Sequence, residues 1–403
     1  MPRQGGPASV GEREDSMANG VPAPLGHYRP DAPVVLEQPL LREALPTPAL
    51  VLQRSAFERN LAAMQSLVAS YGLGLRPHGK MHKCPEVARR QRAAGALGLC
   101  VAKPREAEVM AQAGVGPLLV TSPVLAPQAL DRMVALCVSG ADLTLVVDSF
   151  TGIEALAQRA ARAGVVVPVL VDLDPAMGRT GVAPGPEALA RVEAVVKAKG
   201  LAFHGFQHYA GQVQHIAEAG ERQAACEAHH EAARALVMDT EAKGIPVPVF
   251  TGGGTGSVFY DGPAGLYTDL QCGSYAFMDQ EYGVLEGPEG TLLDSFETAL
   301  TVHSTAISQP REGAITVDAG LKSLWPSPLP AVLDLPGARY FFAGDEHGVV
   351  RFGEGGALAL GDRLRLRVSH CDPTVNLYDW LWIENDAEEI VEAWPIAARG
   401  GAW

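Results

Sequence analysis

Cysteine is scarce in this 403-residue sequence, with six residues and no CxxC pair. Disulfide scaffolds carry cysteine much more densely, so that class is excluded, and the sparse thiols favour a reducing, cytoplasmic compartment. Long apolar runs are also missing. The longest uncharged stretch, Val109 to Leu130, contains three prolines, whereas a membrane helix needs about 20 mainly apolar residues. The first residues carry acids and have no apolar segment, which excludes a secretory signal.

Charged side chains make up 19% of the residues, below the usual share of about 25%. Hydrophobic residues reach 47%, which is enough for a large core and excludes a disordered chain. Positive charge is the scarcer sign, and the net charge is −14. We therefore expect no nucleic-acid or anionic-membrane surface, although a basic pocket for one phosphate remains possible.

From about position 46, short apolar runs alternate with stretches of helical spacing. Repeated strand–helix units predict parallel strands joined by right-handed crossovers. Eight such units favour a closed α/β barrel, (β/α)8, and an open doubly wound sheet is the alternative. The predicted strands are 49–52, 73–76, 98–102, 117–121, 143–148, 167–173, 202–206 and 247–251, with a helix in each gap.

After about residue 290 the sequence changes to short strand-like runs separated by turns, without long amphipathic helices. This pattern predicts a β-rich second domain. Its predicted strands are 301–307, 314–317, 339–342, 349–351 and 363–369. We therefore predict a disordered leader at 1–28, an α/β barrel at 29–290 and a β-rich domain at 291–403.

Barrel enzymes place their sites at the C-terminal ends of the strands, so residues that follow strands are the first candidates. RPHGKMHK, residues 76–83, sets Lys80 and Lys83 beside two histidines. Neighbouring cations lower the pKa of a lysine and favour the neutral amine that forms a Schiff base. A solvated basic loop would have the same kind of sequence. In MGRTGV, Arg179 follows another strand, where it could contact a ring or an anion, or occupy an ordinary turn.

Two later segments also follow predicted strands. QHYAGQVQH, residues 207–215, offers an aromatic ring and a histidine that can titrate near neutrality, although such residues are more often structural. TGGGTGS, residues 251–257, lets backbone amides converge on an anion. It lacks the GK[ST] ending of a Walker loop. Its position favours phosphate binding over a flexible turn, and QCGSY, residues 271–275, could close the same cup.

HCDPTVNLYD, residues 370–379, lies in the β-rich region. On a strand, His370 and Asp372 would share one face and Cys371 would point away. One imidazole and one carboxylate can form half of a metal site, and an ordinary polar strand end fits equally. Because such a pair leaves most positions to water and substrate, we expect Mn²⁺ or Mg²⁺ rather than Zn²⁺.

Together these five segments resemble the D-threonine aldolase and D-serine dehydratase-like group, most closely D-threonine aldolase. These are pyridoxal-phosphate (PLP) enzymes with the alanine-racemase, fold-type III architecture. The resemblance runs from about Pro46 to Trp403. It implies that PLP and its substrate are held by Lys80 (covalent attachment), Arg179 (facing the pyridine nitrogen), Tyr209 (lining the cofactor site) and His215 (acting on the substrate). It also implies phosphate contacts from Gly253, Gly254, Thr255, Gly273, Ser274 and Tyr275, and a divalent metal on His370 and Asp372.

The activity that the resemblance implies is cleavage of a D-β-hydroxy-α-amino acid into glycine and an aldehyde, by a homodimer. The alternatives with the same cofactor are a 3-hydroxyaspartate aldolase and a dehydratase that acts on D-serine or 3-hydroxyaspartate and releases ammonia. An amino-acid racemase would lack the His/Asp pair. A non-catalytic PLP-binding protein would be a lone barrel, which the long C-terminal extension argues against.

Overall fold

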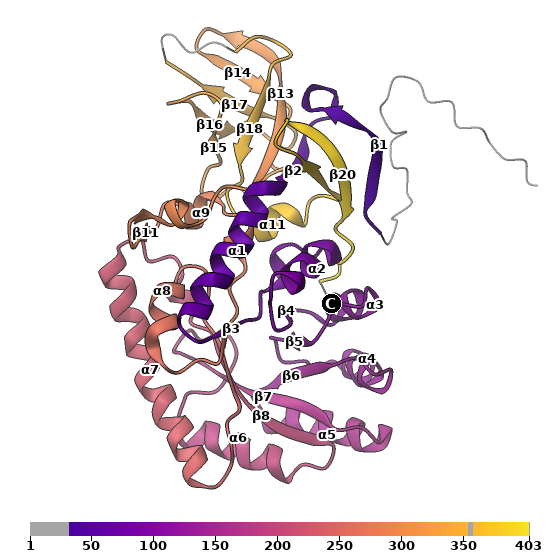
Figure 1. Ribbon diagram of the computed structural model, residues 1–403, viewed down its shortest axis with the longest axis vertical. Helices are drawn as coiled ribbons and strands as arrows, with labels where there is room; N and C mark the ends of the chain where they lie inside the picture. Colours follow the sequence, from indigo (N-terminus) through magenta and orange to yellow (C-terminus); the bar gives the residue numbers. More distant parts are fainter. Residues whose placement is uncertain (1–31, 354–357, 403) are drawn as a thin grey trace, which may run out of the picture.

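The computed structural model describes residues 32–353 and 358–402. The predicted leader at 1–28 lies outside the described residues. Within them, the chain forms an α/β domain and a β-rich domain that meet at one end of the parallel strands (Figure 1). No helix in these two ranges is long and apolar enough to cross a membrane.

A parallel sheet of eight strands forms the first domain, in the order β3-β10-β9-β8-β7-β6-β5-β4 for the described residues. It closes on itself, because a parallel bridge joins His78 to Cys100 and the Leu97 amide donates to the Leu75 carbonyl at 2.8 Å. The prediction of a closed barrel rather than an open sheet is confirmed. The strands are β3 (Gly74–Leu75), β4 (Leu99–Val101), β5 (Leu118–Val120), β6 (Leu143–Val147), β7 (Val167–Leu173), β8 (Leu201–His208), β9 (Val249–Gly252) and β10 (Asp269–Leu270).

Helices cover the outside of this barrel (Figure 1). Several of them, α2, α3, α4 and α6, begin with proline, which suits a first turn whose amides need no intrahelical acceptor. In α5 the Ser149 hydroxyl accepts from the Gly152 amide at 3.2 Å. The main helices are α1 (Arg54–Ser70), α2 (Pro85–Ala93), α3 (Pro104–Gln112), α4 (Pro127–Val138), α5 (Phe150–Ala163), α6 (Pro186–Lys197) and α7 (Ala219–Ala242).

The strand predicted at 49–52 belongs to the other sheet, which corrects its assignment to the barrel. This strand, β2 (Ala49–Gln53), pairs antiparallel with β13 (Leu300–Arg311) and parallel with β19 (Trp380–Glu384). The barrel position is taken by β10, which the sequence did not reveal. β2 is a short apolar run buried on both faces, and such a run has the same sequence pattern in either sheet. β10 has only two residues, which are too few to show a periodic pattern.

The second sheet has the order β1-β20-β19-β2-β13-β14-β17-β16-β15-β18, and β13 also pairs with β18. The strands predicted after residue 300 are confirmed, except that the last one ends at Arg367 instead of residue 369. The domain limits at 28 and 290 stay a prediction. The remaining elements are β1 (Val34–Leu41), β11 (Glu286–Gly287), β12 (Gly290–Thr291), β14 (Ala314–Val317), β15 (Ala331–Val332), β16 (Arg339–Phe342), β17 (Gly348–Arg351), β18 (Arg363–Arg367), β20 (Glu389–Pro395), α8 (Val258–Asp261), α9 (Gln280–Gly283), α10 (Leu292–Ser295) and α11 (Cys371–Val375).

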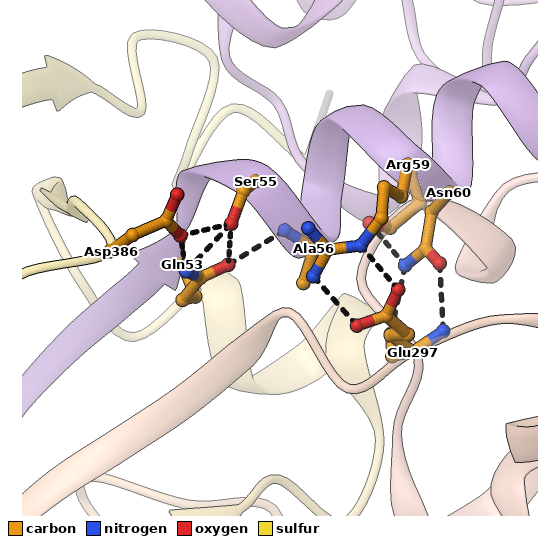
Figure 2. A network of polar contacts seen from close by, with 8 residues as sticks. Gln53, Ser55, Ala56, Arg59, Asn60, Glu297 and Asp386 are labelled. Atoms are coloured by element: carbon orange, nitrogen blue, oxygen red, sulfur yellow. Dashed lines mark hydrogen bonds and ion pairs between the residues drawn. The ribbon is translucent and has the colours of Figure 1, made fainter.

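Polar contacts at the start of α1 join the two domains (Figure 2). Gln53 Nε2 donates to Asp386 Oδ1 at 2.8 Å, next to strand β20. Asn60 is buried, and it binds the Glu297 backbone twice, at 2.8 Å to the carbonyl and 2.7 Å from the amide. The Arg59–Glu297 ion pair at 2.6 Å is exposed and contributes little. The buried amide contacts therefore hold the segment that leads into β13 against the barrel.

Candidate active site

A pocket opens at the C-terminal ends of the barrel strands, against the second domain. The structure brings most of the predicted site residues together there. Those that line the pocket are Lys80, Arg179, Tyr209, His215, Gly254, Thr255, Gly273, Ser274, His370 and Asp372. Gly253 and Tyr275 lie behind the lining. Gly253 has a φ of +67°, and the Tyr275 ring packs edge-on against Phe296.

Lys80 lies in a 3₁₀ turn (Gly79–Met81) directly after β3. Its Nζ is 3.1 Å from Asp372 Oδ1. This carboxylate raises the pKa of Lys80 to about 12, although burial and Arg179 oppose the shift. The expectation that neighbouring cations lower this pKa is therefore wrong for the protein without ligands. The nearby histidines bring no charge, because burial lowers the pKa of His82 to about 4 and that of His78 well below its usual range.

Lys83, the competing lysine, points to a different place. Its Nζ lies 3.1 Å from Asn376 Oδ1 and 3.5 Å from Glu106 Oε1. The Glu106 carboxylate is buried, so the Lys83 ammonium neutralises a charge inside the protein. Of the two lysines, Lys80 alone lines the pocket.

Backbone amides from two segments meet at one side of the pocket. The Tyr275 amide donates to Thr255 Oγ1 at 3.1 Å, which joins the loop after β9 to the turn after β10. In the described part of the chain, the amides of Thr255, Gly273 and Ser274 donate to no protein acceptor. Their residues line the pocket. Unpaired amides that converge on one place suit an anion, so this cup fits the phosphate of PLP.

The loop after β9 is held from behind by a buried polar network. The Gly254 amide donates to Ser257 Oγ at 3.1 Å, and Gln214 Nε2 donates to the same oxygen at 2.8 Å. Asp261 accepts from His230 Nε2 at 2.9 Å and also from the Ser257 hydroxyl. A Cβ at Gly254 would come within 2.3 Å of Gln214 Oε1, so a larger residue here would displace the Gln214 side chain from this network.

Arg179 and Tyr209 face each other across the ends of β7 and β8. The guanidinium carbon of Arg179 lies 5.1 Å from the centroid of the Tyr209 ring. Both residues line the pocket. Because arginine stays protonated and only donates, it suits an unprotonated ring nitrogen such as the one that the sequence analysis assigned to it.

Polar residues that the sequence analysis missed line the pocket at His78, Thr121 and Gln207 and contact this lining at Asp172 and Thr180. Gln207 Nε2 donates to Asp172 Oδ1 and to the Thr121 carbonyl, both at 2.8 Å. Thr180 Oγ1 donates to Asp172 Oδ2 at 2.8 Å, and His78 Nε2 lies 3.0 Å from Thr121 Oγ1. Burial raises the pKa of Asp172 to about 6. The only sequence signal for these residues was a polar side chain at the end of a buried strand.

His370 and Asp372 meet in the pocket, but not as neighbours on a strand. His370 is extended and directly precedes α11, whose first turn contains Asp372. His370 Nε2 lies 3.7 Å from Asp372 Oδ2. Pro373 in this first turn favours a helix start, which is why the predicted strand ends early. Cys371 is buried and lies outside the pocket lining.

One imidazole nitrogen and one carboxylate oxygen, both facing the pocket, are donors that suit a divalent cation. Among the described residues, no three His, Cys, Asp or Glu side chains are arranged to hold a metal ion. The pair therefore fits an open half-site, whose other positions would be filled by water and substrate.

Two acidic residues next to His370 were also missed. Asp279 Oδ2 lies 3.1 Å from His370 Nδ1, and Glu281 Oε2 lies 2.9 Å from the same nitrogen. Glu281 also reaches His215 Nδ1, at 3.5 Å. Burial opposes a charge on His370, but these carboxylates and Asp372 outweigh it and raise the pKa of the imidazole to about 10.

Comparisons with known proteins cover both domains. Residues 52–281 match the family model described as alanine racemase, N-terminal domain, and residues 299–383 match a putative serine dehydratase domain. The chain is 40% identical over 357 residues to a D-threonine aldolase of an Arthrobacter species, which covers 88% of this chain and 93% of that protein. It is 37% identical over 359 residues to a 3-hydroxy-D-aspartate aldolase of Paracoccus denitrificans (strain Pd 1222), covering 88% and 92%.

Among solved structures, the chain is similar to a D-threonine aldolase from Filomicrobium marinum. The TM-score is 0.85 and the identity 36%, over 92% of this chain and 98% of that one. This similarity extends across the pocket, since it covers both the barrel and the β-rich domain.

Proposed function

We propose that this chain, which belongs to the D-threonine aldolase and D-serine dehydratase-like family of alanine-racemase-type lyases, cleaves D-threonine-like β-hydroxy-α-amino acids into glycine and an aldehyde. The observation that carries the proposal is the meeting of Lys80 from the barrel with Asp372 from the second domain, at 3.1 Å, beside a cup of free amides. The homodimer and the cytoplasmic location stay predictions.

PLP, when bound, supplies the electron sink that allows a Cα–Cβ bond to break. In this pocket Lys80 would hold it covalently, and the amides of Thr255, Gly273 and Ser274 would hold its phosphate. Arg179 would face the ring nitrogen and keep it unprotonated. Lys80 and Arg179 would thus both contact the cofactor, and the outer part of the pocket would remain for the substrate.

His370 and Asp372 would hold a divalent cation, which supplies Lewis acidity next to the substrate hydroxyl. His215 lies on the same side, with its ring 5.0 Å from that of Tyr282 and Tyr282 in turn 6.5 Å from His370. We assign His215 as the base that removes the proton from the β-hydroxyl.

The charges around the pocket favour an uncharged β-substituent. Within the described residues, Lys80 and Arg179 are the lysine and arginine of the lining, and both are assigned to the cofactor. Asp279, Glu281 and Asp372 concentrate negative charge around His370. A second carboxylate on the substrate, as in 3-hydroxyaspartate, would meet these acids, and the divalent cation beside them is already assigned to the hydroxyl.

We therefore expect kcat/KM for D-threonine to exceed that for D-3-hydroxyaspartate by at least about tenfold, a difference of about 1.4 kcal/mol. The test is a product assay on both substrates and on D-serine. Glycine with an aldehyde supports the proposed cleavage, whereas ammonia with a keto acid would identify a dehydratase. A preference for D-3-hydroxyaspartate would favour the activity of the Paracoccus relative.

Replacing His215 with alanine should lower kcat by about 10²–10⁴, the usual contribution of a general base. The PLP absorbance should stay unchanged, because His215 lies outside the amide cup. His229→Ala is the matched control, since His229 lies on α7 outside the pocket lining, with Nε2 3.1 Å from Gln212 Nε2. Unchanged turnover in His215→Ala, or loss of PLP, would assign the proton transfer to another group.

A further inference from the structure

The side chain of Asp279 is fully buried, and three contacts hold it in place. Its Oδ1 accepts from the Tyr282 amide at 2.9 Å, which caps helix α9. Its Oδ2 accepts from the Cys371 amide at 2.8 Å and lies 3.1 Å from His370 Nδ1. The exposed fraction of the carboxylate side chain is 0%. Because two backbone amides hold it, this carboxylate has one orientation.

A buried carboxylate accepts hydrogen bonds, so the proton between Asp279 and His370 belongs to Nδ1. In the neutral ring that a metal ion requires, the other nitrogen, Nε2, then carries the lone pair. That nitrogen faces the pocket, 3.7 Å from Asp372 Oδ2. A metal-binding histidine typically has its second nitrogen fixed by a carboxylate in this way.

We infer that Asp279 is a positioning residue, which fixes the Nδ1–H tautomer of His370 and reserves Nε2 for the metal ion. The inference rests on the metal site of the proposed function and adds a residue that touches neither metal nor substrate.

Glu281 is the rival for this role, because its Oε2 lies 2.9 Å from the same Nδ1. Its side chain is 29% exposed, and its other oxygen lies 3.5 Å from His215. Glu281 is therefore shared between two histidines, whereas Asp279 serves one.

The test is the affinity of the PLP-loaded, metal-stripped protein for Mn²⁺, measured from the electron paramagnetic resonance signal of free Mn²⁺. Asp279→Asn can keep the helix cap through its carbonyl oxygen but turns an NH₂ group toward His370 Nδ1. That group favours the opposite tautomer and places a proton on Nε2. We expect Mn²⁺ affinity to fall by about 10–100-fold, the usual effect of losing such a partner.

Asp279→Ser keeps a capping hydroxyl for the Tyr282 amide and removes the carboxylate without adding a competing donor. It should weaken Mn²⁺ binding less than Asp279→Asn, and Glu281→Gln should change it by less than about threefold. In all three variants the PLP absorbance and Tm should match the parent, and excess Mn²⁺ should restore most of kcat.

Several outcomes would overturn the inference. Affinity within threefold of the parent in both Asp279 variants removes the role, and a loss confined to Glu281→Gln transfers it to the rival. If both Asp279 variants lose PLP or melt early, the carboxylate supports the fold rather than the ligand. A separate control protects the proposed function: if the parent binds no Mn²⁺, or His370→Ala binds it equally well, the metal site itself fails.

Discussion

Replacing Lys80 with arginine should abolish lyase turnover and covalent attachment of PLP. Arginine keeps the positive charge beside Asp372, whose Oδ1 lies 3.1 Å from Nζ in the parent. A guanidinium remains protonated at all working pH values, so it cannot attack the PLP aldehyde as a free amine can. The loss would therefore report on the covalent link rather than on the ion pair. Absorbance of the bound cofactor and turnover of D-threonine are the two measurements.

Lys83→Arg is the matched control. The substitution keeps a cation next to the buried Glu106 carboxylate, which lies 3.5 Å from Lys83 Nζ. It should leave turnover within about threefold, because Lys83 lies outside the pocket lining. Borohydride reduction of the parent followed by peptide mapping should place the pyridoxyl group on Lys80. A label on Lys83, or turnover by Lys80→Arg, would refute the assignment.

Local sequence signals predicted the barrel well where each element carried its own pattern. A helix was predicted in each gap between strands, and α1 to α7 are the helices observed there, because apolar spacing acts locally. There were two errors: β2 was assigned to the wrong sheet, and the two-residue strand β10 was not predicted. The choice of sheet depends on distant partners, such as the pairing of Leu50 with Val302, and one strand's own residues do not encode it.

The candidate site divides in the same way. Lys80, Arg179 and the glycine loop after β9 were recognisable, because each lies in a dense motif at the end of a strand. Asp279 and Glu281 were not, since they lie at the start of the four-residue helix α9 and reach His370 about 90 residues later. The pKa of Lys80 was predicted in the wrong direction for the same reason. Its dominant neighbour, Asp372, comes from the other domain and is invisible from the segment around the lysine.

Removal of the divalent metal should abolish cleavage and leave PLP in place. Lewis acidity from a bound ion typically contributes several kcal/mol to transition-state stabilisation. Each factor of ten in rate corresponds to about 1.4 kcal/mol, so we expect kcat to fall by about 10²–10⁴. The amide cup that would hold the phosphate is formed by Thr255, Gly273 and Ser274, none of which is a metal ligand. Incubation with a chelator, followed by an absorbance spectrum and a D-threonine assay, separates the two sites.

Asp372→Ala should behave like the chelated parent, and a chelator should lower its activity no further. The two losses of activity should therefore not add, because the substitution and the chelator remove the same interaction. This result distinguishes a metal role of Asp372 from a general loss of activity.

Cys371→Ser is the neighbouring control. Cys371 is buried outside the pocket lining, and its backbone amide, which donates to Asp279 Oδ2 at 2.8 Å, is unaffected by the change. That variant should stay active with Mn²⁺. Loss of metal in Cys371→Ser would assign a thiolate ligand and favour Zn²⁺, whereas full activity of Asp372→Ala in excess chelator would exclude a catalytic metal at this pair.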